Sequence, residues 1–405
     1  MKEWRKIKLG EICDVKGGKR LPKGTSLISI PNSHPYIRIR DMYQHKYLEI
    51  NKEFEYVDEQ TFQRISRYTV NKGDVIVAIV GNTIGLVSMI GESLDNASLT
   101  ENCVKLINLK QCLSEFLYYH LISDYGQSDI KRRIVGTSQP KLPIYNIQGI
   151  EMQLPPIDEQ KAIVDTLSCL DDKIELNNRM NKTLEEMAQA IFKSWFVDFE
   201  PFRDGEFEDS ELGRIPKGWR VIELGEVFKF IKGKKPKELL DINISENEQK
   251  YLTIDVLNGG NPQFACIDKM VLSSIYDVLM VMDGASSGTV YFGYKGIVAS
   301  TIAKLEIHQE QLREILYQYL KLNEAEVKIH NTGSAIPHTD KSYVLGCKIA
   351  IPDENILEPI ALLLKKIREI IINNSKENKI LTTIRDSLLL KLMSGEIRVP
   401  IVKGN

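Results

Sequence analysis

The sequence lacks the residue spacings that would indicate a metal site or a disulfide scaffold. Its 405 residues include six cysteines, and no two of them form a CxxC pair. The six histidines form no HExxH motif and no pair at i, i+4. These absences argue against zinc ligation. The first residues contain no apolar stretch of the signal-peptide type, so we expect free, mostly buried thiols in a reducing cytoplasm.

Long hydrophobic runs are also missing. The longest, Val75 to Ile90, has 16 residues and is interrupted by Asn82 and Thr83. It is shorter than the roughly 20 apolar residues that a helix needs to cross a bilayer. The run therefore predicts a buried strand-turn-strand, and we expect no membrane partner.

Catalytic motifs are absent as well. There is no GxxxxGK[ST] loop and no GxGxxG after a predicted strand, which argues against a nucleotide-binding fold. The two glycine-bounded segments, 81–85 and 284–288, predict tight turns. The only Pro-Pro, at 155–156, lacks the acidic and aromatic neighbours found in DNA amino-methyltransferases. The sequence therefore predicts a binding protein and no enzyme.

Charge of one sign is not in excess. The net charge is −2, with 43% hydrophobic and 27% charged residues, which is typical of a globular protein. Any nucleic-acid site must then be a local basic patch on a nearly neutral body.

What the sequence does contain is a long internal repeat. The segment Trp4-Arg-Lys-Ile-Lys-Leu-Gly-Glu11 recurs 215 residues later as Trp219-Arg-Val-Ile-Glu-Leu-Gly-Glu226. Four further segments recur in the same order. They are Gly18-Lys19 with Gly233-Lys234, Tyr36–Ile39 with Tyr251–Ile254, Asp74–Gly81 with Asp277–Gly284, and Gly136–Pro140 with Gly333–Pro337. Ordered matches of this kind indicate two copies of one structural unit.

Each half ends in a long helical pattern with apolar residues alternately four and three positions apart. Such spacing, sustained over several heptads, predicts a coiled-coil seam, although two helices that each pack on their own domain would fit as well. Matching asparagines within the two patterns favour helices that pack on each other. The predicted seam residues are Ile163, Leu167, Leu170, Ile174, Asn177, Asn181, Leu184, Ile360, Leu364, Ile367, Ile371, Asn374, Asn378 and Leu381.

The boundaries follow from prolines, glycines and charge. Asp158 and Asp353 are the expected N-caps of the two helices, and Gly395 is expected to end the second. A helix over 158–196 would measure about 58 Å. The acidic, Gly- and Pro-containing stretch after the first helix predicts an exposed linker. The resulting order is a domain at 1–157, a helix at 158–199, a linker at 200–218, a domain at 219–352 and a helix at 353–397.

The residue patterns of both globular parts predict a mixture of helices and strands. Strands are expected at 36–40, 75–80, 87–90 and 104–107, and at 251–254, 278–282, 290–292 and 303–307. A helix is expected after each set, at 113–122 and 311–322.

Basic residues cluster at matching places in the two halves, beside repeated loops. Basic side chains hold phosphates, and small polar side chains in such loops can reach base edges. A solvated surface is the alternative for any single lysine. The candidate DNA-binding residues of the first half are Lys16, Lys19, Arg20, Lys23, Lys131, Arg132, Arg133, Thr137, Ser138, Gln139 and Lys141. Those of the second half are Lys232, Lys234, Lys235, Lys237, Lys328, His330, Ser334, His338 and Lys341.

Several segments together resemble one known family. They are the Trp-(x)4-Leu-Gly-Glu openings at Trp4 and Trp219, Gly136-Thr-Ser-Gln-Pro140, Leu154-Pro-Pro-Ile-Asp-Glu-Gln-Lys161, Asp209-Ser-Glu-Leu-Gly-Arg-Ile-Pro-Lys-Gly-Trp219 and Lys391-Leu-Met-Ser-Gly-Glu-Ile397. Over essentially its whole length, the chain resembles the specificity (S) subunit, HsdS, of type I restriction-modification systems.

The resemblance implies an α+β fold. Two similar mixed α/β target-recognition domains would be joined by two long antiparallel coiled-coil helices, with a pseudo-twofold internal repeat. Each domain would read one half of a bipartite, asymmetric site in double-stranded DNA, and the helices would set the gap between the halves. The chain itself would hold no cofactor or metal and would catalyse nothing.

The resemblance also implies partners. Two methylation subunits would carry S-adenosylmethionine and methylate adenine N6, and restriction subunits would use ATP and Mg²⁺. A related system, in which methylase and nuclease share one polypeptide, is an alternative setting. A coiled-coil scaffold that does not contact DNA is a further alternative, which the near-neutral charge allows.

The halves differ where bases would be read. Gln139 and Lys141 of the first half are matched by Ile336 and His338 of the second. The two domains should therefore recognise different bases. The second helix also lacks the Asp-Glu-Gln opening of the first, and its predicted seam has Arg385 where the first has Ala188.

Overall fold

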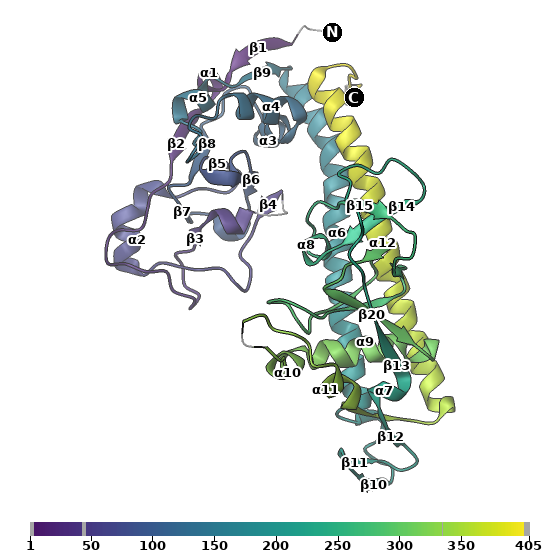
Figure 1. Cartoon of the computed structure of the whole chain (residues 1–405). Helices are drawn as coiled ribbons and strands as arrows, with labels where there is room; N and C mark the ends of the chain where they lie inside the picture. Colours follow the sequence, from purple (N-terminus) through teal and green to yellow (C-terminus); the bar gives the residue numbers. More distant parts are fainter. Residues whose placement is uncertain (1–3, 43–45, 334, 401–405) are drawn as a thin grey trace. The chain divides into compact units, whose positions relative to one another are not determined.

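The computed structural model describes residues 4–42, 46–333 and 335–400 (Figure 1). The chain divides into two compact units. The first comprises the described residues up to Glu175 together with those from Asn378 onward, and the second comprises Leu176–Glu377. Each unit thus combines one globular part with a segment of each long helix.

The first unit is built around a five-stranded sheet of order β2-β8-β5-β6-β4, with the smaller pairs β1-β9 and β3-β7 beside it. Its strands are β1 (Arg5–Lys8), β2 (Asp14–Gly17), β3 (Tyr36–Ile37), β4 (Tyr47–Leu48), β5 (Val75–Ala78), β6 (Val87–Ile90), β7 (Ser98–Leu99), β8 (Cys103–Ile107) and β9 (Glu151–Leu154). Its shorter helices are α1 (Leu9–Ile12), α2 (Glu59–Ile65), α3 (Ser114–Ile122), α4 (Asp124–Arg132) and α5 (Ile144–Gln148).

The second unit repeats this plan. Its main sheet has the order β13-β20-β17-β18, and a second sheet has the order β15-β14-β19-β16. The strands are β10 (Phe207–Ser210), β11 (Gly213–Pro216), β12 (Arg220–Glu223), β13 (Phe228–Lys232), β14 (Glu248–Leu252), β15 (Phe264–Cys266), β16 (Leu272–Ser273), β17 (Val278–Val281), β18 (Val290–Phe292), β19 (Gly296–Val298), β20 (Ile302–Ile307) and β21 (Lys348–Ile351). The shorter helices are α7 (Leu224–Val227), α8 (Ile254–Leu257), α9 (Arg313–Leu322), α10 (Glu324–Ile329) and α11 (Lys341–Gly346).

The predicted strands and helices lie within a few residues of those observed. The main exception is the strand expected at 36–40. It ends at Ile37, because the chain turns into a 3-10 helix at Ile39–Met42. The carboxylate of Asp41 accepts the backbone N–H of Arg38 and holds that turn. The run from Val75 to Ile90 is the expected buried strand-turn-strand.

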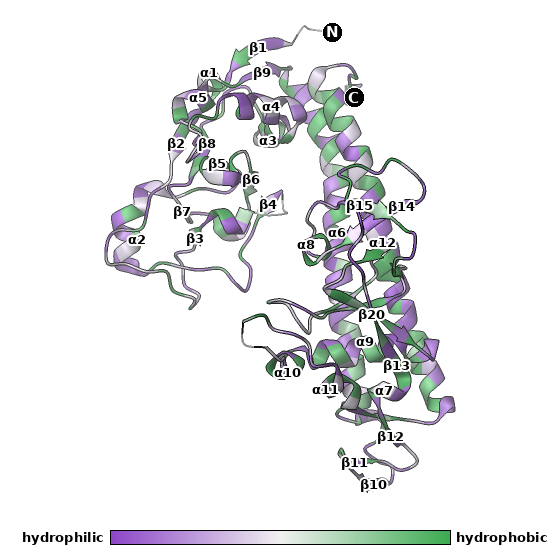
Figure 2. Cartoon of the chain, in the orientation of Figure 1, coloured by the Kyte–Doolittle hydropathy of each residue, from purple (hydrophilic) through white to green (hydrophobic). Residues whose placement is uncertain are grey.

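The two long helices are α6 (Ile157–Phe196) and α12 (Glu354–Ser394), and along both of them hydrophobic and hydrophilic residues alternate (Figure 2). They run antiparallel, because partner numbers fall in α12 as they rise in α6. In the first unit Asp171 bonds Arg385, and the carbonyl of Ile174 accepts from Asn378. In the second unit Asn181 bonds Asn374, and Glu185 bonds Arg368.

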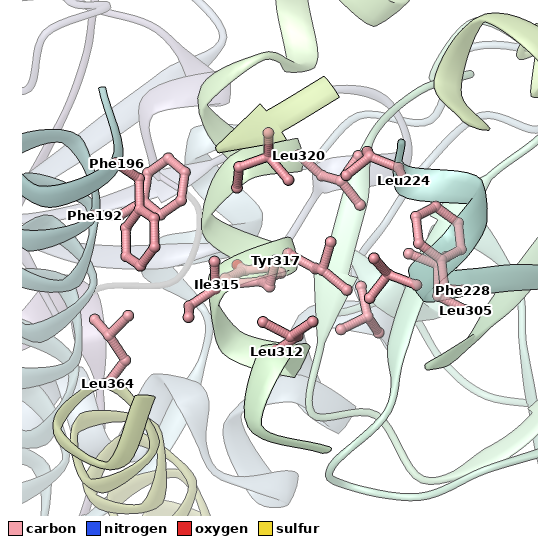
Figure 3. Close-up of a cluster of buried hydrophobic side chains, with 14 of the residues drawn as sticks. Phe192, Phe196, Leu224, Phe228, Leu305, Leu312, Ile315, Tyr317, Leu320 and Leu364 are labelled. Carbon is pink, nitrogen blue, oxygen red and sulfur yellow. The ribbon is translucent and has the colours of Figure 1, made fainter. Parts of the chain in front are cut away.

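A hydrophobic core in the second unit ties the helix pair to the sheet. Figure 3 shows Phe192, Phe196 and Leu364 of the long helices on one side of α9, and sheet-side residues including Phe228 on the other. Phe192, Leu364 and Phe228 have no exposed surface. Truncating Phe192 to alanine would cost about 3–5 kcal/mol of stability.

The helix ends agree with the prediction in two places and differ in one. Asp353 directly precedes α12, and Gly395, with φ of 74°, follows its last residue. Asp158, expected as an N-cap, instead lies inside the first turn of α6. The helix starts earlier because the carbonyl of Pro156 accepts the N–H groups of Glu159 and Gln160, at 2.9 and 3.0 Å. An acidic side chain there still favours the positive end of the helix dipole.

The predicted linker is mostly exposed but carries structure. A 3-10 turn at Glu200–Phe202 is followed by the β10–β11 hairpin, and Ile215 on that hairpin is buried in the core of the second unit. The domain boundaries themselves stay a prediction.

The cysteines are free, as expected, but only half of them are buried. Cys13, Cys103 and Cys112 are buried, Cys347 is half-buried, and Cys169 and Cys266 are exposed. Across the described residues, no helix is both long and apolar enough to span a bilayer.

Candidate nucleic-acid interface

One edge of the first unit's main sheet gathers several predicted segments. Because β2 and β5 both run antiparallel to β8, the ends of β2 and β5 and the start of β8 lie at the same edge. The basic segment with Lys19 and Arg20 leaves β2 at this edge. The turn 81–85 joins β5 to β6 there.

The loop 136–140 docks onto that turn through backbone hydrogen bonds. The N–H of Gly81 donates to the carbonyl of Pro140 at 3.1 Å. Val135 and Lys141 exchange two backbone bonds of 2.9 Å and close the base of the loop. The side chains of Thr137, Ser138 and Gln139 are exposed. The backbone thus fixes the loop and leaves these side chains free to contact a ligand.

The second unit forms the same arrangement with different side chains. The N–H of Gly284 donates to the carbonyl of Pro337 at 2.9 Å, and Thr332 and His338 exchange bonds of 2.8 and 2.7 Å. Gly136 and Gly333 both have φ of 86°, a conformation that disfavours other residues. The shared Gly-x-x-x-Pro pattern therefore encodes a shared loop geometry.

The repeated Gly-Lys pair is explained by a close backbone approach. A Cβ on Gly18 would lie 2.0 Å from the carbonyl oxygen of Thr100, and one on Gly233 would lie 2.2 Å from that of Ala299. Only glycine lets the chain leave the sheet there, so the following lysine starts the basic segment at the same place in both units.

Eight of the predicted basic residues are exposed and make no ion pair with any described residue. Lys19 lies over the ring of Tyr68 at 5.4 Å, and the ammonium of Lys234 donates to the carbonyl of Lys269 at 3.2 Å. Their charges are available to phosphates. The eight are Lys19, Lys23, Lys131, Lys141, Lys234, Lys235, Lys237 and Lys341.

Others are held by carboxylates of their own unit. Arg132 and Arg133 both bond Asp129, at 3.3 and 3.1 Å, and point back onto α4. Two residues of the predicted set are also engaged locally, because Lys328 pairs with Glu324 at 2.6 Å and His330 stacks on Tyr343. Lys16 lies 3.9 Å from Asp14, and Arg20 lies 2.7 Å from Glu101. Ser334 lies outside the described residues.

Two predicted residues of the second unit meet on an acid that sequence reasoning missed. Asp283 bonds the ammonium of Lys232 at 2.9 Å and Nδ1 of His338 at 2.8 Å. Partial burial opposes ionisation, but the hydrogen bonds from Lys232 and His338 outweigh it and lower the pKa of Asp283. The internal repeat could have revealed this acid, because Asp283 stands at the position of Val80 in the first half.

A second missed feature is an arginine-lined cavity in the first unit. Arg38 and Arg40 join Arg20 around a space of about 380 Å³ at the edge where β2 ends. The repeat of Tyr36–Ile39 contained Arg38, but nothing in its spacing indicated a site.

The predicted seam residues all lie on buried or half-buried faces of α6 and α12. The asparagines bond across the helix pair. Asn374 donates to Asn181 at 2.9 Å, and Asn177, which has no exposed surface, donates to Glu377 at 2.8 Å. Buried polar contacts of this kind specify register at a cost in stability. Among the residues that the structure describes, no group of three His, Cys, Asp or Glu side chains could hold a metal ion.

Comparison with known proteins supports the duplication. The family described as "Type I restriction modification DNA specificity domain" matches residues 1–186 and again residues 216–382. The chain belongs to this family. A DNA-recognition role follows from the membership, and the two matches correspond to the two copies of the repeat.

Named relatives of this specificity-domain chain match along nearly its full length. The MjaIX specificity subunit of Methanocaldococcus jannaschii is 27% identical and covers 98% of this chain and 94% of its own. The HindI specificity subunit of Haemophilus influenzae is 25% identical and covers 98% and 100%. The S subunit of a type I restriction-modification system from M. genitalium shares the fold, with a TM-score of 0.56, 20% identity and 96% coverage of both chains. The α+β fold with two domains and paired antiparallel helices is therefore confirmed.

Proposed function

We propose that this specificity subunit reads a bipartite, asymmetric sequence in double-stranded DNA, one half with each unit. The observation that carries the proposal is the repeated sheet edge. In each unit, a glycine N–H and a proline carbonyl dock the recognition loop onto a turn. The exposed loop side chains differ, with Gln139 in one and Ile336 in the other. A common frame with different reading residues suits two unlike half-sites.

The unpaired lysines support the DNA contact. In each unit the lysines that follow the first strand of the main sheet, β2 or β13, leave the same sheet edge as the docked loop. Contacts to phosphates hold the register of a protein on DNA, and base contacts then supply the sequence preference. Lys19 and Lys23 of the first unit and Lys234, Lys235 and Lys237 of the second are the expected phosphate contacts.

The helix pair is proposed to set the gap between half-sites and to hold two methylation subunits. Both helices are continuous, and polar bonds between them fix their register. Apolar side chains also remain exposed on them, which suits a protein partner. In the second unit these include Leu176, Met187, Leu363 and Ile370, and in the first Ile384 and Leu390.

Catalysis is assigned to the partners. S-adenosylmethionine would be held by the methylation subunits, and ATP and Mg²⁺ by restriction subunits. The chain itself would work in the cytoplasm as a non-catalytic subunit that chooses the sequence and supports assembly.

The test is a map of N6-methyladenine in the host genome with and without this gene. We expect a split motif that disappears on deletion. Gln139→Ala and His338→Ala should each alter a different half of that motif, because they lie in different units. The two variants serve as controls for each other.

A genome that loses no motif would redirect the question to purified protein. The chain, reconstituted with its methylation subunits, should bind DNA with an affinity that falls steeply as salt rises. Absence of DNA binding at low salt by a complex that still assembles would favour the scaffold and contradict the proposal.

A further inference from the structure

The main sheets of the two units differ by one strand. In the first unit β4 is the fifth strand and pairs parallel with β6, with Tyr47 opposite Met89. In the second unit the sheet ends at β18, the counterpart of β6, and no strand of the described residues pairs with its outer side. The sequence explains the difference. The offset of the repeat falls from 215 residues at Tyr36 to 203 at Asp74, so the second copy is 12 residues shorter here.

The open edge of β18 presents backbone groups that β4 covers in the first unit. There the N–H of Met89 points away from β5 and donates to the carbonyl of Lys46 at 2.8 Å. Phe292 stands at the position of Met89 in the repeat and is opposite the corresponding residue of its neighbouring strand, Val278. Because N–H groups alternate in direction along a strand, that of Phe292 faces the open edge. Such an edge is a template for pairing with another strand.

The segment that forms β4 also fills a polar cleft. The ammonium group of Lys46 bonds the hydroxyls of Ser168 at 2.7 Å and Tyr119 at 3.1 Å. Burial lowers the pKa of Lys46, and three nearby acids oppose this shift. They are Asp171, Asp172 and Glu115. The first unit thus places its own cation, followed by the aromatic Tyr47, between the sheet and the helices α3 and α6.

The same place in the second unit is an open cleft of about 490 Å³. Its walls contain counterparts of the residues around Lys46. They are Glu314 for Glu115, Lys365 for Ser168 and Glu369 for Asp172. Phe292, Tyr276 and Leu362 add apolar surface, and Leu362 is 49% exposed. The cleft therefore borders both the open edge of β18 and helix α12.

The charges of this cleft leave two acids without a partner. Its three cations, Arg313, Lys365 and Arg368, each lie within ion-pair distance of an acid of the same unit. Glu358 and Glu369 are exposed and form no ion pair with any described residue. A ligand with a positive charge finds free carboxylates here, whereas a phosphate would be repelled.

We propose that the edge of β18 and the acidic cleft beside it bind an extended segment of a methylation subunit, in which a lysine or arginine precedes an aromatic residue. The segment would pair with β18 as β4 pairs with β6, and its cation would lie where Lys46 lies in the first unit. The wall formed by α12 identifies the partner, because the long helices are already proposed to hold methylation subunits. The proposal rests on that function and applies to the second unit alone, since the first fills its own cleft.

The first test compares hydrogen exchange in the free chain and in its complex with the methylation subunits. We expect the amide of Phe292 to exchange at least about 10-fold more slowly in the complex. The amide of Met89 should be protected in both states, because β4 covers it, and serves as the internal reference. Assembly that leaves exchange at β18 unchanged would overturn the proposal. Protection of β18 by a DNA duplex alone, or by a second copy of the chain, would also overturn it.

The second test reverses the two free acids. The combined variant Glu358→Lys, Glu369→Lys should bind one methylation subunit about 10-fold more weakly and lose the protection of β18, because like charges then meet. Both residues are exposed, so the fold should persist. Mass photometry counts complexes with one and with two methylation subunits. Glu246→Lys, at an exposed acid of the same unit, is the control and should change nothing. Equal weakening by the control, or none in the combined variant, would contradict the proposal.

Failure of this site can be told apart from failure of the proposed function. A chain that assembles with two methylation subunits and yields a split motif, but keeps β18 open to exchange, would lack only this contact. A chain that binds no methylation subunit would contradict both proposals.

Discussion

The two units share a backbone frame but differ in the polar groups placed on it. At the sheet edge of the first unit, Val80 forms a backbone bridge with Lys141, and that lysine has no ion pair among the described residues. At the same place in the second unit, Asp283 forms a bridge with His338 and also bonds its ring. The frame is kept by glycines and backbone bonds, so the side chains on it can change without loss of the fold.

The two units also place different polar contacts on the pair of long helices. In the second unit Arg368 of α12 bonds Glu314 of α9 at 2.7 Å and Glu185 of α6 at 2.9 Å. In the first unit the acid is again on α6 and the arginine on α12, with Asp171 and Arg385 2.9 Å apart, but among the described residues no second acid joins them from a short helix. Each unit locks its helix register with its own ion pair.

The two units should differ most in the stability that each loses when its ion pair is broken. Arg368→Met leaves two acids at a site where Arg368 and Glu314 are each about 5% exposed. Burial raises the pKa of Glu314 even beside Arg368, so the unpaired carboxyl is costly. We expect the second unit to lose about 3–5 kcal/mol. The more exposed Arg385→Met should cost the first unit about 1–2 kcal/mol.

Hydrogen exchange with mass spectrometry can follow each unit separately, which matters because a two-unit chain need not unfold in one step. A combined replacement of Arg368, Glu185 and Glu314 by Met, Leu and Leu should recover most of the loss. Equal costs for Arg368→Met and Arg385→Met would contradict this ranking.

The shared backbone features of the two units could be predicted from the sequence, because they occur twice in it. Periodicity gave the long helices and their seam, and recurring glycines gave the docked loops, since both depend on local residue pattern. Gly18 and Gly233 recur for a reason that is visible only in three dimensions, namely the carbonyls that approach them.

The ion pairs and side-chain hydrogen bonds could not be predicted from the sequence, because they join segments far apart in the chain. Asp283 and His338 are 55 residues apart, and Arg368 and Glu185 are 183 apart. Periodicity carries no information on such pairs. The arginines around the cavity of the first unit were missed for the same reason, because Glu55 and Glu101 orient them from other segments.

Two buried groups give the first unit opposite responses to acid. His120 is buried, and burial lowers its pKa from 6.5 to about 4, while Tyr319 stands at its place in the second unit. The unfolded chain takes up a proton at this position near pH 6.5 and the folded chain does not, so stability falls as pH drops from 6.5 to 4. The loss of stability caused by His120 is at most about 3 kcal/mol.

Asp41 opposes this trend in the same unit. Burial raises its pKa from 3.8 to about 6, so the folded state binds a proton first and gains stability as pH falls from 6 to 3.8. His120→Gln should therefore leave a first unit that becomes more stable between pH 6 and 4. Asp41→Asn should instead expose the full loss. Hydrogen exchange of the first unit against pH measures both, and parallel profiles for the two variants would refute the assignment.

The smallest expected effect removes the difference between the two sheet edges. Asp283→Asn keeps the size of the side chain but releases Lys232 and weakens the hold on His338. We expect a change of about fivefold in preference at one position of the second half-site, worth about 1 kcal/mol. Asp268→Asn, an exposed acid of the same unit, controls for the change in net charge. The reciprocal variant, Val80→Asp, places an acid beside Lys141 and should shift preference only in the first half-site. If both variants left the split motif intact, the charged groups beside these loops would not set the base preference, and the different bases would have to be read elsewhere in each unit.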